Sequence, residues 1–139
     1  MRPRAMLVMA GLLMVGCGVE PVRMMPGDLC NRCRRTITDT RVAAELIDKA
    51  GRAYKFHSTG CMAKYLKAHP EEQSGTLFAT DYGTGRLVTV SSVRFVATTQ
   101  DREVDYSAYY TDAGAKEAAG REKTTPVEWQ KVLADAPAQ

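Results

Sequence analysis

The cysteine pattern constrains this chain more than any other feature of its sequence. Three of the four cysteines, one of the two histidines and a methionine lie between Cys30 and Met62. Cys30 and Cys33 form a Cys-x-x-Cys pair, and His57 and Cys61 follow after two strand-like runs. A Cys-x-x-Cys turn presents two thiolates on one side of a tight loop, which is typical of sites for soft metal ions. The sequence therefore predicts a small unit folded around a metal site.

The N-terminal residues have the form of an export signal. A basic start with two arginines precedes an apolar run, residues 5–16, which is shorter than the roughly 20 residues that cross a bilayer. Residues 14–17, Met-Val-Gly-Cys, resemble a bacterial lipobox, in which the cysteine is lipidated and becomes the mature N-terminus. We expect a lipoprotein signal peptide over 1–16, lipid attachment at Cys17 and a membrane tether over 17–29. The protein would then lie on the periplasmic side of a bacterial membrane, with an ordinary secretory signal as the alternative.

The charge balance excludes one class of partner. Cleavage before Cys17 leaves 123 residues, with 17 basic and 16 acidic side chains. Because this balance is nearly neutral and no long basic stripe is present, we expect no nucleic-acid partner. Three cysteines then remain in a compartment that permits disulfides, and an odd number cannot all pair within one chain.

Hydrophobic periodicity predicts a ββαβ unit over residues 30–83. Two runs have the period of two that is typical of strands, with turn residues between them, which indicates a β-hairpin. In the first run Val42, Ala44 and Leu46 alternate with Ala43, Glu45 and Ile47, and in the second Tyr54 and Phe56 alternate with Lys55 and His57. Residues 58–60 have N-cap chemistry, and apolar residues at helical spacing predict a helix from about Gly60 to His69. A strand over 76–82 completes the unit.

Cys61 falls in the first turn of that predicted helix. The positive end of the helix dipole lies there and favours a thiolate, which is the form that binds a metal. We therefore expect Cys61 to meet the Cys-x-x-Cys turn as a third sulfur ligand.

The second half repeats this order. Its predicted elements are strands over 87–90 and 93–97, a strand-like run over 104–110, a helix over 112–121 and a strand over 125–129. The fold class is therefore α+β, with two small homologous ββαβ units packed together, the second over 84–139. Alignment of Ser58–Cys61 with Thr111–Gly114 places Gly114 where the first unit has Cys61. Because no sulfur follows Met62, the chemistry belongs to the first unit.

Two metals suit the candidate ligands. Cys30, Cys33, His57 and Cys61 make a tetrahedral zinc set like that of a treble-clef finger. Two or three of the thiolates with the thioether of Met62 suit Cu(I), which prefers sulfur and low coordination numbers. Met62 also has the spacing of a core residue, and Met24 and Met25 lie on the tether, so a purely structural role for each stays open.

These residues together resemble a known family. The Cys-x-x-Cys pair, the hairpin, Ser58 ahead of Cys61-Met62, and residues 77–81 running into Thr84-Gly85-Arg86-Leu87 are similar to NosL, the accessory lipoprotein of nitrous-oxide reductase. The resemblance covers nearly the whole mature chain. Family members usually carry Gly-Met directly after the second cysteine, where this chain has Arg34-Arg35, and a Met-Gly motif in the second half, where residues 98–109 contain no methionine.

The resemblance implies a lipid-anchored protein that binds Cu(I) and hands it to a periplasmic copper enzyme, such as nitrous-oxide reductase, or exchanges it with a membrane copper transporter. The ligands that it implies are Cys30, Cys33, Cys61 and Met62. The other interpretations are a zinc-binding or disulfide-stabilised lipoprotein that serves as an interaction scaffold, and a thiol oxidoreductase. We expect no enzyme activity, because the sequence has neither a believable Ser/His/Asp set nor a phosphate-binding glycine loop.

Overall fold

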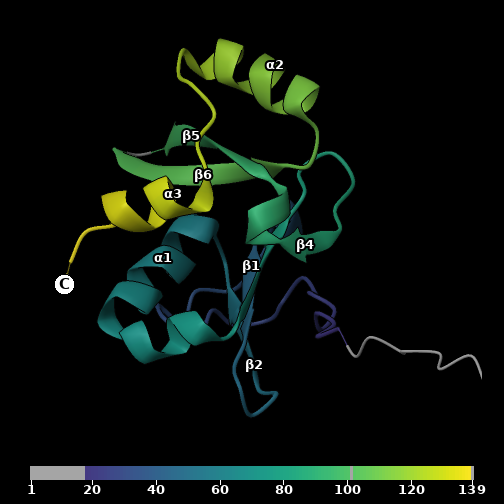
Figure 1. The fold of residues 1–139 in the computed structure, drawn as a ribbon, viewed down its shortest axis with the longest axis vertical. Helices are drawn as coiled ribbons and strands as arrows, with labels where there is room; N and C mark the ends of the chain where they lie inside the picture. Colours follow the sequence, from purple (N-terminus) through teal and green to yellow (C-terminus); the bar gives the residue numbers. More distant parts are fainter. Residues whose placement is uncertain (1–17, 101, 139) are drawn as a thin grey trace, which may run out of the picture.

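The protein is described by a computed structural model over residues 18–100 and 102–138 (Figure 1). The signal peptide and Cys17 lie outside these residues. The strands are β1 (Ala44–Ile47), β2 (Ala53–Phe56), β3 (Thr76–Thr80), β4 (Leu87–Thr89), β5 (Arg94–Gln100) and β6 (Glu103–Tyr109), and the helices are α1 (Thr59–Ala68), α2 (Asp112–Glu122) and α3 (Trp129–Asp135). Short 3₁₀ turns span Thr40–Val42, Pro70–Ser74 and Val90–Ser92. In this described part of the chain, no helix has both the length and the apolar character needed to cross a bilayer.

The predicted hairpin, helix and strand of the first unit are confirmed. β1, β2, α1 and β3 follow in the order ββαβ, and β1 pairs antiparallel with both β2 and β3. Ala44 lies opposite Phe56 on one side and Ala79 on the other. α1 begins after its N-cap Ser58 and ends before His69, whose ring packs 4.4 Å from that of Tyr65. The local periodicity of the sequence was therefore sufficient to predict the order of elements in this unit.

Both faces of the first sheet are covered. Ala44 and Leu46 belong to the core that packs under α1, whereas Glu45 points to the opposite face and is nevertheless fully buried. Part of the expected tether covers that face, because the Val22 N–H donates to Glu45 Oε1 at 2.7 Å and Lys55 Nζ donates to the Arg23 carbonyl at 3.0 Å. The chain is thus held by the fold from residue 22 onward.

The second half has the expected order of elements with different strand boundaries. The strands predicted over 87–90 and 93–97 correspond to β4 and the first part of β5, but they do not pair with each other, because β4 pairs with β3 and β5 pairs with β6. The 3₁₀ turn after β4 separates it from β5. The strand expected over 125–129 is reduced to one bridge between Val127 and Phe95, since Trp129 already begins α3.

The repeat is nevertheless visible in the topology. β5 lies between β6 and Val127 as β1 lies between β2 and β3, with antiparallel pairing in each case. The N-caps also correspond, because Ser58 Oγ accepts from the Cys61 N–H and Thr111 Oγ1 accepts from the Gly114 N–H, both at 3.1 Å. Gly114 therefore occupies the position of Cys61, as the sequence alignment predicted.

The two units share one core. Figure 1 shows the β5–β6 hairpin between α2 on one side and α3 on the other. Val96 packs against alanines of α2, while Phe95 faces Trp129 of α3 and joins the core that contains Met62 and Leu66 of α1. The α+β class with two packed units is confirmed.

Candidate metal centre

Cys30 and Cys33 lie on a short turn that the backbone ties together at its base. The Arg34 N–H donates to the Cys30 carbonyl at 3.0 Å, and the Cys30 N–H donates to the Arg35 carbonyl at 2.9 Å. Arg34 adopts a left-handed conformation with φ 63°. Asn31 fixes the turn to β2, because its N–H donates to the Lys55 carbonyl at 2.7 Å and its side chain accepts from the Lys55 N–H at 2.7 Å.

The other two candidate ligands come from the junction between β2 and α1. His57 follows the last residue of β2, and Cys61 lies in the first turn of α1, three residues after the N-cap Ser58. The hydrogen bond between Ser58 Oγ and the Cys61 N–H fixes the direction in which this turn begins. Because Asn31 joins the cysteine turn to β2, the turn and the helix start meet at the same place.

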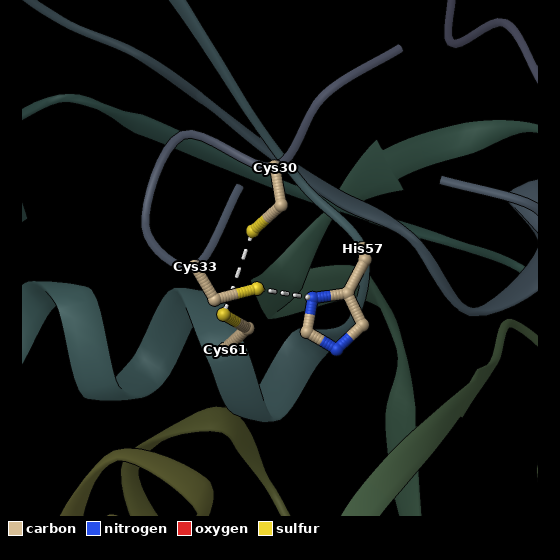
Figure 2. Close-up of side chains that lie close together, drawn as sticks. All are labelled: Cys30, Cys33, His57 and Cys61. Atoms are coloured by element: carbon tan, nitrogen blue, oxygen red, sulfur yellow. Dashed lines mark hydrogen bonds between the residues drawn. The ribbon is translucent and has the colours of Figure 1, made fainter. Parts of the chain in front are cut away.

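The structure brings all four of these residues together. The donor atoms of Cys30, Cys33, His57 and Cys61 all lie within 4.8 Å of one another. Cys30 Sγ lies 3.5 Å from Cys61 Sγ, and Cys33 Sγ lies 3.3 Å from His57 Nδ1. Figure 2 shows the four side chains pointing toward one another. Zn²⁺ binds thiolate sulfur at about 2.3 Å, so two thiolates on a tetrahedral ion are separated by about 3.8 Å. The observed spacing fits one soft ion among these ligands.

The cluster is buried on one side and accessible on the other. Cys30 is fully buried and Cys61 is 4% exposed, whereas Cys33 and His57 are half-buried. A small hollow of about 60 Å³ leads to the cluster and includes Cys33, His57 and Cys61 in its lining. We call this hollow the mouth of the site. An ion held by these residues is reached from this side.

Protonation of the two buried sulfurs is coupled. A hydrogen bond from Cys61 lowers the pKa of the Cys30 thiol below its ordinary value, and hydrogen bonds from His57 and from backbone amides act in the same direction. The hydrogen bond to Cys30 raises the pKa of Cys61, and burial raises it further. The two thiols therefore do not ionise independently, and a bound cation would favour the thiolate form of both.

The pKa of Cys61 shifts in the direction opposite to the one expected from its place in the helix. The helix start was expected to lower the pKa of this cysteine, but the hydrogen bond with Cys30 and the burial of the thiol raise it. Arg32 acts in the opposite direction, because its Nη1 lies 3.9 Å from Cys61 Sγ and lowers the pKa. In the sequence Arg32 is next to Cys33, which did not indicate that its side chain would contact Cys61.

The methionines occupy different environments. Met62 is fully buried in the core shared by both units. Met24 and Met25 line a separate hollow of about 660 Å³ beside β4, together with Thr80 and Arg86. A ligand role for Met62 stays a prediction, and the structure shows it as a core residue.

The second unit contributes a residue that sequence reasoning missed. Asp105 of β6 accepts a hydrogen bond from the Gly60 N–H at 2.8 Å, and so contacts the first turn of α1. A Cβ added at Gly60 would lie 2.8 Å from Asp105 Oδ1, closer than side chains pack. No local pattern could have predicted this contact, because 45 residues separate its partners.

The fold and the cluster together define a class: a small α+β protein with a Cys₃His site of the composition that binds soft metal ions. No protein family model matches the chain, and no curated protein sequence matches it either. The comparison with solved structures finds the crystal structure of the copper chaperone NosL from Shewanella denitrificans, with a TM-score of 0.69. The match covers 82% of this chain and 96% of that one at 13% sequence identity. The chain therefore has the NosL fold, as the resemblance predicted.

Proposed function

We propose that this chain is a divergent NosL-type protein that binds Cu(I) as its cargo and transfers it to another protein. The observation that carries the proposal is the convergence of three cysteine sulfurs and His57 Nδ1 within 4.8 Å of one another on this fold. Thiolate-rich sites select Cu(I) among the biological copper ions. The proposed ligands are Cys30, Cys33 and Cys61, with His57 or Met62 as a further donor.

The accessibility of the site supports transfer rather than permanent storage. Cys30 and Cys61 are buried, while Cys33 and His57 stand at the mouth. An incoming ligand can replace the donors at the mouth first, while the buried sulfurs still hold the ion. This stepwise exchange needs no unfolding of the protein, and it involves no covalent change in the cargo. We therefore propose a carrier rather than an enzyme.

A structural zinc site is the second candidate. Four donors of the composition Cys₃His, spaced as a tetrahedral ion requires, are the usual ligand set of closed zinc sites. Zinc would make the cluster a fold-stabilising element of an interaction scaffold. The accessible mouth favours copper, because a structural zinc site has no need of one.

The place of the protein in the cell is part of the same proposal. The lipobox at residues 14–17 supports export and a lipid anchor at Cys17, which would hold the protein on the periplasmic side of a bacterial membrane. The partner would be a periplasmic copper enzyme or a membrane copper transporter. Nucleic acid is not among the proposed partners, because the charge of the mature chain is nearly balanced.

Metal analysis of the full chain tests this function. The protein is purified in detergent under reducing, anaerobic conditions, and its copper and zinc contents are measured with its free thiols. One equivalent of copper with three reduced cysteines in residues 30–61 supports the carrier. One equivalent of zinc that Cu(I) cannot displace supports the scaffold. Protein without metal, in which two of Cys30, Cys33 and Cys61 are joined as a disulfide, contradicts both metal functions.

A further inference from the structure

The mouth of the metal site is ringed by positive charge. Besides the ligands and Ser58, its lining consists of Arg32, Arg35, Lys64 and Glu103. Three cations thus face one anion around this hollow. Arg34, next to this lining, is exposed and adds to the same field.

These cations do not all have the same role. Arg32 lies 3.9 Å from Cys61 Sγ and so interacts with the site itself. Arg35 and Lys64 line the mouth, and within residues 18–100 and 102–138 neither forms an ion pair. Some cations elsewhere in the described residues are paired, namely Arg41, Arg52, Lys55, Arg94, Arg121 and Lys131, whereas Lys49 and Lys116 are not. The charges of Arg35 and Lys64 are therefore not neutralised by an ion pair within the described residues, and both lie at the mouth.

The positive charge at the mouth indicates that the metal arrives or leaves bound to another molecule and not as a free cation. A cationic mouth repels a free metal cation and attracts negatively charged groups. The hollow, at about 60 Å³, has room for the end of one side chain but not for a bulky ligand. A donor atom that enters the mouth therefore has to project from a larger, negatively charged surface.

On the basis of the copper-transfer function proposed above, we infer that the mouth is the docking surface for a protein partner that presents a soft metal-binding side chain within an acidic segment. Arg35 and Lys64 would contact the carboxylates of that segment, and the soft side chain would enter the hollow beside Cys33 and His57. Charge pairs at the rim of an interface act mainly on the rate of association.

Transfer of Cu(I) to two matched peptides tests this inference. Both peptides carry the same Cys-x-x-Cys core, one flanked by glutamates and the other by lysines. The full chain in detergent is loaded with one equivalent of Cu(I) under anaerobic conditions, and transfer is followed by stopped flow. We expect transfer to the acidic peptide to be at least about tenfold faster at low ionic strength, and the difference to shrink at high salt. Equal rates for the two peptides would overturn the docking surface.

A pair of double variants locates the effect. Arg35→Gln with Lys64→Gln should remove most of the preference for the acidic peptide and leave the equilibrium affinity for Cu(I) unchanged. Lys49→Gln with Lys116→Gln removes two exposed charges elsewhere and should keep the preference. If this control lowers the preference equally, only net charge matters and the mouth is not the docking surface. Absence of Cu(I) binding by the unaltered chain would instead reject the proposed function, and the docking inference with it.

Discussion

Asp105 Oδ1 accepts the Gly60 N–H at 2.8 Å, so a side chain of the second unit caps the helix that carries Cys61. Ser58 accepts from the Cys61 N–H in the same turn. The unsatisfied N–H groups of the helix start are thus shared between a residue of the first unit and a residue of the second. The second unit has no sulfur of its own, but it holds the turn that carries Cys61, a candidate ligand of the first.

Asp105→Ala should therefore weaken both the fold and the site. Loss of an N-terminal cap costs about 1 kcal/mol of unfolding free energy, and residues that orient metal ligands change affinity by about 10-fold or more. Thr111→Ala is the control, because it removes a side-chain cap from the N-terminus of α2, a helix that carries no cysteine. Urea unfolding and competition with a Cu(I) chelator measure the two effects. Equal losses of copper affinity in both variants would mean that Asp105 acts only through overall stability.

Cys61→Ser should weaken Cu(I) binding more than Met62→Leu does. The serine variant loses a thiolate that lies 3.5 Å from Cys30 Sγ, whereas leucine keeps the volume of a buried core residue and should cost less than about 1.5 kcal/mol of stability. Chelator competition ranks the affinities, and thermal unfolding checks the fold. A large loss of affinity in Met62→Leu at unchanged stability would identify the thioether as a ligand.

His57→Ala should distinguish the two candidate metals. Three thiolates are sufficient for Cu(I), but zinc loses its fourth donor, so we expect zinc affinity to fall by at least about 100-fold and Cu(I) affinity to fall much less. Titrations with chelators specific for each ion provide the comparison. His69→Ala is the control, since this residue packs on Tyr65 and is not part of the cluster. A larger loss for copper than for zinc would argue against a Cys₃ copper site.

Glu45 should give the protein a measurable pH dependence of stability. Burial raises the pKa of this carboxyl, and its Oε2 has no hydrogen-bond partner in the described residues. A carboxyl whose pKa is higher in the folded than in the unfolded protein stabilises the fold at pH values below its unfolded-state pKa, which is about 4.3 for glutamate. This stabilisation is lost as the pH rises through the folded-state pKa. The Glu45→Gln variant has no carboxyl to ionise at this position, so it does not lose stability in this way. The unfolding free energy of the variant minus that of the parent protein should therefore increase between pH 4 and pH 8, by on the order of 1 kcal/mol. Urea unfolding at several pH values measures the difference, and a constant difference would contradict the assignment.

Cys17→Ser should release the protein from the membrane without affecting its fold. A lipid chain contributes about 0.8 kcal/mol per buried CH₂ group, so the parent protein should sediment with membranes. Fractionation of cells that express each form gives the readout, with circular dichroism as the check of folding. Recovery of the parent protein entirely in the soluble periplasmic fraction would disprove the lipid anchor.

The first unit was predictable because its signals are local. Alternating residues marked the hairpin, Ser58 marked the start of α1, and the positions of Cys30, Cys33, His57 and Cys61 on these elements implied that they meet. The structure brings these four residues together. The turn fixes the positions of Cys30 and Cys33, and the start of α1 fixes the position of Cys61. Once the hairpin forms, these three sulfur atoms have few other places to lie.

The second half shows where local signals fail. Residues 87–90 and 93–97 were predicted as separate strands, but the pairing of β4 with β3 could not be predicted from them, because it depends on the first unit. The covering of Glu45 by residues 22–29 was equally hidden, because that segment has no periodicity and its bonds span 23 residues or more. Contacts of this kind depend on the assembled fold.

The early attachment of the chain to its own sheet has a consequence at the bilayer. With Cys17 lipidated as proposed, only five Cα–Cα steps separate the lipid from Val22, whose N–H is already bonded to Glu45. A fully extended segment of this length spans about 18 Å at most. The folded body would then stay against the headgroups, with its range of orientations restricted. A partner would have to present its acidic segment at the membrane surface rather than approach from the open periplasm.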